Sequence, residues 1–238
     1  MTTILFLLAI LAQDDDAAAT AALDKFKADY KSKEATGRAS AVAELARTQH
    51  EKVAARLGQI LGMDVNEVRI AAAKGLGGNT VNRRKAVAML SVGAAANARD
   101  PMVMAAILEA VGKLKEPIGA AEVERHFKSK QIPQAKAAIE AAASIGSRSS
   151  VHPLIETLRW LEEGAKEAPA YGNGNGGAGG AAGIGGGGTV DEAGRERERM
   201  LRPIVIKALE ALTKANRGSA KEWEDWWRTD GARFMSGK

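Results

Sequence analysis

The 238-residue sequence contains no cysteine, and this absence removes several kinds of chemistry. Disulfide bonds, thiol nucleophiles, thiolate metal sites and lipid attachment through an N-terminal cysteine are all excluded. Histidine is almost as rare, because only His50, His126 and His152 are present and no two of them lie three or four residues apart. A zinc site needs three or four suitably spaced ligands, so the sequence predicts no metal site and no cofactor.

Aromatic residues are also scarce, at 4% of the chain, whereas alanine alone accounts for 47 residues. Aromatic side chains favour strands, and alanine has the highest helix propensity of all residues. A small side chain also lets neighbouring helices approach each other closely. The composition therefore predicts an all-α protein of closely packed helices.

The sequence has no apolar run long enough to span a membrane, since Ile4–Ala12 comprises only nine residues and a spanning helix needs about 20. A short apolar run followed by polar residues is typical of a secretory signal peptide. We therefore expect residues 1–13 to be a signal peptide and the protein to be periplasmic or secreted. The alternative is that this run forms a buried turn of an N-terminal helix.

Apolar periodicity predicts a series of short helices from residue 14 to residue 168. Asp64 before Val65 and Asp100 before Pro101 are typical N-cap signals. Helix stops are predicted at four places: Gly62, Gly77-Gly78, Gly112 and Gly146. The predicted helices cover residues 17–31, 35–47, 50–62, 65–77, 81–97, 101–115, 119–128, 132–146 and 150–166.

These helices repeat along the chain. Three pairs, Leu76-Gly77, Val111-Gly112 and Ile145-Gly146, lie 35 and 34 residues apart, and three apolar columns share that register. The columns are Val68, Val103 and Ala137; Ala72, Ile107 and Ala141; and Ala73, Leu108 and Ala142. A period of about 35 residues is typical of an α-solenoid, in which stacked helix pairs share one continuous core. We therefore predict an α-solenoid of stacked antiparallel helix pairs.

Residues 64–77, with the sequence DVNEVRIAAAKGLG, resemble the second helix of the short HEAT-like repeats found in phycobilisome lyases and many bacterial scaffolds. That pattern is an acidic residue, then Val-Arg, small residues and Leu-Gly. The resemblance covers residues 35–167, although Met104 replaces the arginine in the next unit. It implies a HEAT-like fold in which Asp64 and Arg69 connect neighbouring repeats. Residues 208–227 resemble the tail of exported bacterial HEAT-repeat proteins.

The composition changes sharply after Pro169, because eleven of the 18 residues from Tyr171 to Gly188 are glycine. We expect residues 169–190 to form a flexible linker and residues 191–238 to form a helical cap. Three tryptophans share one face of the last helix: Trp223, Trp226 and Trp227. We interpret them as a structural cap packed on Leu209 and Leu212. The alternative is an aromatic ligand site.

No nucleophile motif is present, and acidic pairs such as Glu162-Glu163 are typical of an exposed helix face. We therefore predict a non-catalytic scaffold of the cell envelope that binds an unidentified protein.

Basic and acidic residues are mixed, 34 against 29, so nucleic acid is a disfavoured partner. The alternative function is polyanion or nucleic-acid binding by a basic inner face. An enzyme similar to bilin lyases or HEAT-like DNA glycosylases is a third class, but no catalytic residue of those families matches. The candidate binding residues are Arg69, Lys74, Lys113 and Lys136.

Overall fold

The computed structural model of the chain describes residues 2–165 and 192–237, with side chains from residue 15 onward. All regular secondary structure within these residues is helical, which confirms the all-α prediction. The helices divide between two compact units, Met1–Ser150 and Val151–Lys238. The predicted glycine-rich linker, residues 169–190, lies outside the described residues.

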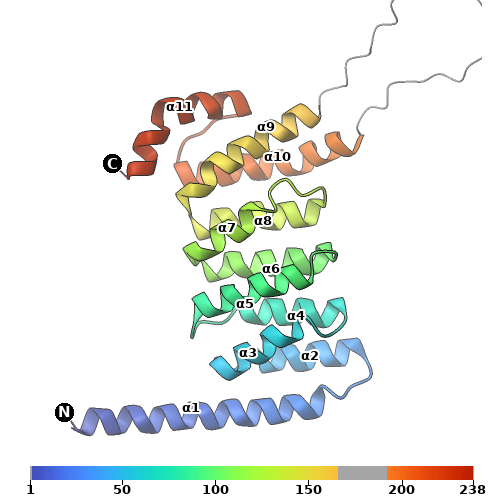
Figure 1. Cartoon of the computed structure of the whole chain (residues 1–238), viewed down its shortest axis with the longest axis vertical. Helices are drawn as coiled ribbons and strands as arrows, with labels where there is room; N and C mark the ends of the chain where they lie inside the picture. The colour runs from blue at the N-terminus through green and yellow to red at the C-terminus, as the bar shows by residue number, and fades with distance from the viewer. Residues whose placement is uncertain (1, 166–191, 238) are drawn as a thin grey trace, which may run out of the picture. The chain divides into compact units, whose positions relative to one another are not determined.

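The first unit follows the predicted helix pattern closely. It contains α1 (Thr2–Asp29), α2 (Ala35–Leu45), α3 (Glu51–Ile60), α4 (Asn66–Gly77), α5 (Arg83–Ala96), α6 (Pro101–Leu114), α7 (Ala120–Glu124) and α8 (Ile132–Ile145), with 3-10 turns at Pro117–Gly119 and Arg148–Ser150 (Figure 1). From α2 onward each helix lies inside its predicted range. The exception is α1, which begins at Thr2 and not at residue 17.

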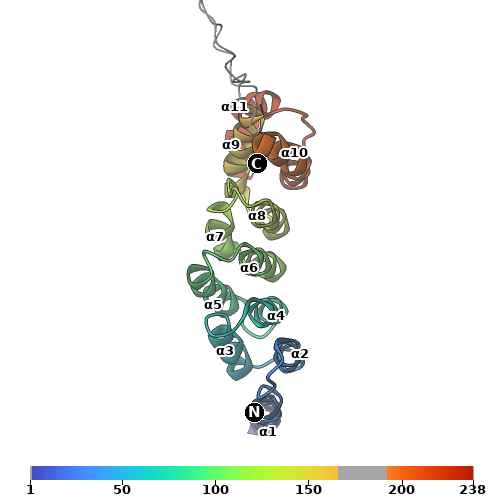
Figure 2. The same cartoon turned by 90° about the vertical axis from the view of Figure 1, so that its right-hand side faces the viewer.

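Two layers of helices make up most of this unit. In one layer α2 packs on α4, α4 on α6, and α6 on α8. The other layer contains α3, α5 and α7, which pack on α4, α6 and α8, respectively, while α3 also contacts α5 (Figure 2). Their interface buries the predicted apolar columns, since Val68, Val103 and Ile107 are fully inaccessible to solvent.

Glycine allows the helices of the first layer to approach each other closely. A Cβ atom at Gly77 would lie 2.8 Å from Cα of Ala110, and one at Gly112 would lie 2.7 Å from Cα of Ala141. Such distances are too short for two carbon atoms, so only glycine fits at these positions. The prediction of Gly112 as a helix stop is therefore wrong, because it lies inside α6 at a helix contact.

The ends of the helices depart from the predicted signals in two places. Asp64 is not the N-cap of α4, because Val65 occupies that position and the Asp64 carboxylate binds other partners, described below. Lys115 ends α6 in the left-handed conformation, with φ 54°. The stop at Gly146 is confirmed, since this residue ends α8 with φ 75°, where glycine carries no Cβ penalty.

The second unit comprises α9 (Val151–Gly164), α10 (Glu192–Thr213) and α11 (Ala220–Ser236), and both α10 and α11 pack on α9. Glu162 of α9 connects all three helices. Its carboxylate accepts a hydrogen bond from the Ala220 amide at 3.2 Å and pairs with Nε of Arg202 at 3.3 Å. The interpretation of Glu162 as part of an exposed helix face is therefore wrong, whereas Glu163 is exposed.

No helix in the part of the chain that the structure describes is long and apolar enough to cross a membrane. The backbone of residues 2–13, the predicted signal peptide, is helical and continuous with the rest of α1. Cleavage of this segment and export of the protein stay predictions.

Candidate functional site

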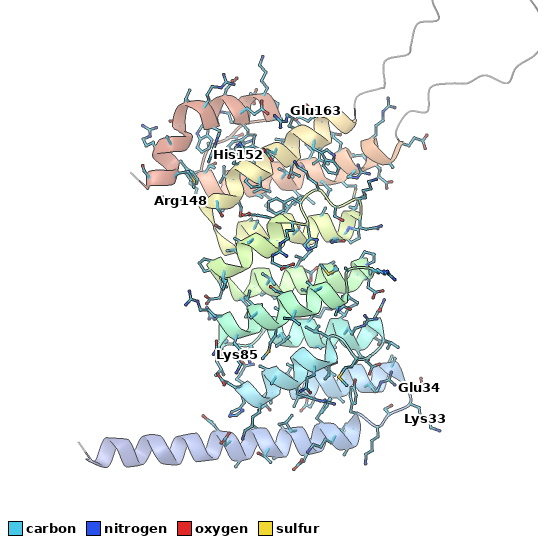
Figure 3. The ribbon with its side chains drawn as sticks, viewed as in Figure 1. Lys33, Glu34, Lys85, Arg148, His152 and Glu163 are labelled. Atoms are coloured by element: carbon cyan, nitrogen blue, oxygen red, sulfur yellow. The ribbon has the colours of Figure 1, made fainter. Side chains whose placement is uncertain are left out.

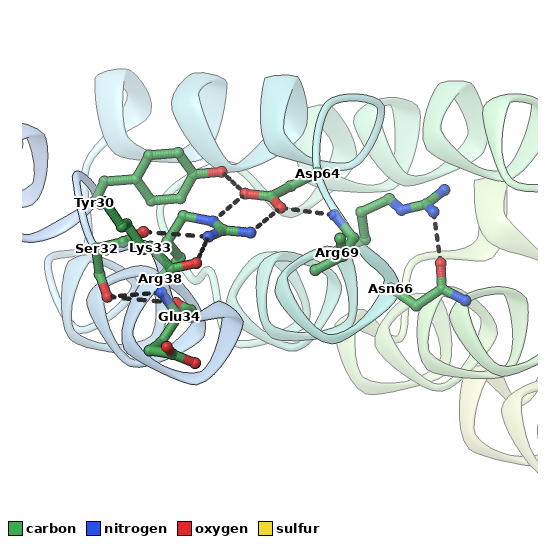
Figure 4. Close-up of polar contacts among 9 residues, drawn as sticks. Tyr30, Ser32, Lys33, Glu34, Arg38, Asp64, Asn66 and Arg69 are labelled. Atoms are coloured by element: carbon green, nitrogen blue, oxygen red, sulfur yellow. Dashed lines mark hydrogen bonds and ion pairs between the residues drawn. The ribbon is translucent and has the colours of Figure 1, made fainter.

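A chain of polar contacts begins where α1 meets α2 and α4 (Figure 4). The guanidinium of Arg38 donates two hydrogen bonds to the Asp64 carboxylate, from Nη2 to Oδ1 at 2.8 Å and from Nε to Oδ2 at 2.9 Å. The Tyr30 hydroxyl donates to Oδ2 at 2.5 Å. Both charged side chains are mostly buried, with 19% of Arg38 and 11% of Asp64 exposed. This bidentate pair therefore fixes α2 against the start of α4.

The same arrangement recurs one helix pair further on. Nη1 of Arg69 donates to Oδ1 of Asn97 at 2.6 Å and to Oδ2 of Asp100 at 3.1 Å. Asn97 is fully buried, and its amide donates to the carbonyl groups of Leu61 and Gly93. We call these six residues the polar ladder: Tyr30, Arg38, Asp64, Arg69, Asn97 and Asp100. Arg69 is thus held in the ladder, and only 18% of its side chain is exposed.

The ladder shifts the acid–base behaviour of its members. The hydrogen bonds from Arg38 hold the pKa of the Asp64 carboxyl well below its usual value. Burial, together with the hydrogen bond to Asp64, raises the pKa of the Tyr30 hydroxyl to about 12. Asp64 is therefore ionised and Tyr30 is neutral throughout the physiological pH range, which is the state that the hydrogen bonds require.

Replacement of Asp64 by Asn should lower the free energy of unfolding at pH 7 by about 1–2 kcal/mol. The neutral amide has only one acceptor oxygen, so it cannot accept both hydrogen bonds from the Arg38 guanidinium. The lowered folded-state pKa means that the Asp64 carboxylate stabilises the protein above its unfolded pKa of about 3.9. This contribution is lost as the pH falls below that value. Urea unfolding at pH 7 and pH 3 should show a smaller difference between variant and wild type at pH 3.

The control for this experiment is Asp24→Asn in α1, because Asp24 is 65% exposed and pairs only with Lys27 among the described residues. Its replacement should change stability by less than about 0.5 kcal/mol. Equal effects of the two substitutions at pH 7 would contradict a special role for Asp64.

The opposite edge of the unit has exposed polar contacts between α3 and α5. Lys85, labelled in Figure 3, lies at this edge. It pairs with Glu51, with Nζ 3.2 Å from Oε2, and Asn82 donates to the same carboxylate at 3.2 Å. Arg83, Arg84 and Lys85 form a basic cluster at the start of α5, and this cluster is thus partly engaged in contacts between helices.

The predicted binding lysines lie on the exposed surface of the layer formed by α2, α4, α6 and α8. Lys74, Lys113 and Lys136 are exposed on α4, α6 and α8, respectively. Exposed glutamates accompany them on the same four helices: Glu44, Glu67, Glu109 and Glu140. Because the two signs of charge are balanced, this surface provides no net positive potential for a polyanion. We call it the first-layer face.

A depression of about 450 Å³ lies on the first-layer face between α2 and α4. Its lining consists mainly of small and apolar residues, with three charged residues: Ala43, Ala46, Arg47, Glu67, Ile70, Ala71, Lys74, Gly75 and Gly78. The two helices are close here because a Cβ atom at Gly75 would lie only 2.7 Å from Cβ of Ala46. We call this feature the α2–α4 depression.

The second unit has a smaller cavity of about 240 Å³, lined by residues of α9 and α11 that include His152 and Trp227. The centroids of these two rings are 5.4 Å apart. The charged groups beside them are already paired, Arg159 with Glu224 at 3.2 Å and Arg228 with Asp225 at 3.0 Å. Such internal pairing leaves little charge available to attract a ligand.

The three C-terminal tryptophans differ in burial. Trp223 is fully buried, whereas Trp226 and Trp227 are partly exposed. The Trp226 ring contacts Trp223 edge-on, at 5.7 Å between centroids, and also contacts Phe234. The main helix contact of α11 is with α9, and not with the part of α10 that carries Leu209. Trp223 is thus the core residue of the cluster, while a role of the cluster as an end cap stays a prediction.

Within residues 15–165 and 192–237, whose side chains the structure describes, no group of three or more His, Asp or Glu side chains could hold a metal ion. Each histidine makes a structural contact. His50 pairs with Asp16, His126 lies between Glu122 and Gln134, and His152 contacts Trp227.

Comparison with protein-family models and with curated proteins gives no match for this chain.

Proposed function

We propose that this protein is a non-catalytic scaffold that binds another protein through the first-layer face of an α-solenoid built from HEAT-like repeats. The repeated pairs Leu76-Gly77 and Val111-Gly112, the two-layer packing and the polar ladder all support this arrangement. Solenoids typically use extended surfaces of this kind to bind partners.

The observation that carries the proposal is the character of the first-layer face. It combines exposed small apolar side chains with balanced charges, and its main depression is broad and open. Protein-binding surfaces are mixed in this way, whereas small-molecule sites are usually enclosed and polyanion sites are strongly basic. We also propose export to the periplasm or cell exterior, on the basis of the apolar run at residues 4–12.

Site-specific photocrosslinking in the native host tests both parts of the proposal. A photoreactive residue at Glu109, exposed on α6, should give a discrete protein adduct in the envelope or secreted fraction. The same residue at Ala88, exposed on α5 in the other layer, should not. The mass of the recovered chain should show removal of about the first 13 residues, the usual consequence of signal-peptide processing.

Two results would count against the proposal. Adducts from Ala88 but not from Glu109 would place the partner on the other layer. Cytoplasmic retention of the intact chain, together with DNA binding that weakens steeply with salt, would favour the nucleic-acid alternative.

A further inference from the structure

We propose that the α2–α4 depression binds an amphipathic α-helix of the partner. The contact face of this helix carries small apolar side chains, with an acidic residue at one end and a basic residue at the other. This inference depends on the proposed scaffold function and identifies the kind of segment that the first-layer face recognises.

The floor of the depression suits the close approach of a helix. Ala43 is exposed, Ile70 and Ala71 are partly exposed, and Gly78 carries no side chain. A surface of such short side chains allows the backbone of an incoming helix to approach closely. The volume of about 450 Å³ is enough for several apolar side chains of a helix laid in a groove.

The charged residues around this floor define what the incoming helix must carry. α2 and α4 run in the same direction, because Arg38 meets Asp64 near their N-terminal ends and Ala46 meets Gly75 near their C-terminal ends. Arg47 and Lys74 therefore lie together at the C-terminal ends. Glu67 lies at the N-terminal end of α4, seven residues before Lys74, which is about 10 Å along the helix axis.

Both cations are able to bind a carboxylate from outside. Lys74 makes no ion pair with any residue that the structure describes, and its side chain is exposed. Arg47, just after the end of α2, pairs among the described residues only with Glu44, and 79% of the Arg47 side chain is exposed, so that pair is weak. An acidic residue of the partner would thus lie beside Arg47 and Lys74, and a basic residue about seven positions away would lie beside Glu67.

The next helix pair does not repeat this combination. The residue that corresponds to Ala43 on α4 is Lys74, and the residue that corresponds to Lys74 on α6 is Glu109. A small apolar floor next to two cations is therefore present between α2 and α4 but not between α4 and α6. Because Glu67 lies on the same floor, a polyanion would be repelled at one end, whereas a helix with one acidic and one basic residue complements both ends.

Selection from a displayed library of single-helix peptides against the full chain tests the inference. The selected peptides should carry an acidic residue (Asp or Glu) and a basic residue (Lys or Arg) seven positions apart on one helix face. Small apolar side chains should lie between them. Ala43→Trp, which fills the depression from an exposed position, should weaken their binding at least tenfold. The control Ala88→Trp, on the exposed surface of α5, should leave binding unchanged.

Reversal of charge provides a test that a misfolded variant could not imitate. Selection against Lys74→Glu should enrich peptides with a basic residue where the wild type selects an acidic one. If the selected peptides bind the Ala43→Trp variant as tightly as the wild type, the inference is wrong and only the broader scaffold function survives. If no helical peptide is selected although crosslinking at Glu109 identifies a partner, the inference is again wrong. Failure of both experiments would refute the inference and the proposed function together.

Discussion

Trp223→Ala should destabilise the second unit by about 3–5 kcal/mol, the usual cost of truncating a fully buried tryptophan. Trp223 is the largest fully buried side chain among the described residues, and α11, the helix that carries it, packs on α9. Its indole Nε1 has no hydrogen-bond partner in the structure, so the loss arises from packing and from the cavity left behind. Denaturant unfolding followed by far-UV circular dichroism measures the effect.

Trp227→Ala provides the matched comparison in the same helix. Trp227 is partly exposed, so its truncation should cost clearly less than that of Trp223. If the loss is larger for Trp227 than for Trp223, the assignment of Trp223 as the core residue of this unit is wrong.

Gly77→Ala should lower the free energy of unfolding of the first unit by about 1–3 kcal/mol, although alanine is normally the better helix former by about 1 kcal/mol. The reason is steric, because the added Cβ would lie 2.8 Å from both Cα and Cβ of Ala110. A backbone atom cannot move aside as the end of a flexible side chain can. α4 and α6 must therefore separate, and their shared core loses contacts.

The neighbouring residue serves as the control for Gly77. Gly78 caps α4 with φ −90°, and a Cβ atom there would lie no closer than 3.5 Å to its nearest neighbour, the Gly75 carbonyl. Gly78→Ala should therefore be neutral or slightly stabilising in the same thermal or chemical unfolding experiment. A Gly77→Ala variant as stable as Gly78→Ala would show that the two helices can separate without cost.

The repeat pattern predicted the helices of the first unit well, because each second helix carries its apolar residues at fixed positions that can be read from one unit to the next. It did not reveal why glycine follows Leu76 and Val111. Glycine is a common helix stop, and the alternative, a contact with a backbone across the layer, depends on the spacing between helices. That spacing is a property of the packed structure and cannot be read from one helix alone.

The polar ladder was predicted only in part. The resemblance indicated that Asp64 and Arg69 connect repeats, but it did not identify Arg38 as the partner of Asp64. A signal was present, because Arg38 precedes Leu45 by seven residues and Arg69 precedes Leu76 by the same interval. It was missed because α2 matches the repeat poorly elsewhere. The lysines of the predicted basic face are exposed on the second helices, but the sequence prediction did not consider the exposed glutamates on the same helices, such as Glu109 and Glu140.

The order of packing in the first unit has a consequence for how the chain acquires its structure. Each helix from α2 to α8 makes its main contacts with its next or next-but-one neighbour along the sequence. Such short-range contacts give a low contact order, which is associated with fast folding because only short loops need to close. A chain that emerges gradually from the ribosome can therefore complete each step of the stack as soon as the following helix pair becomes available, before the C-terminal helices have been synthesised.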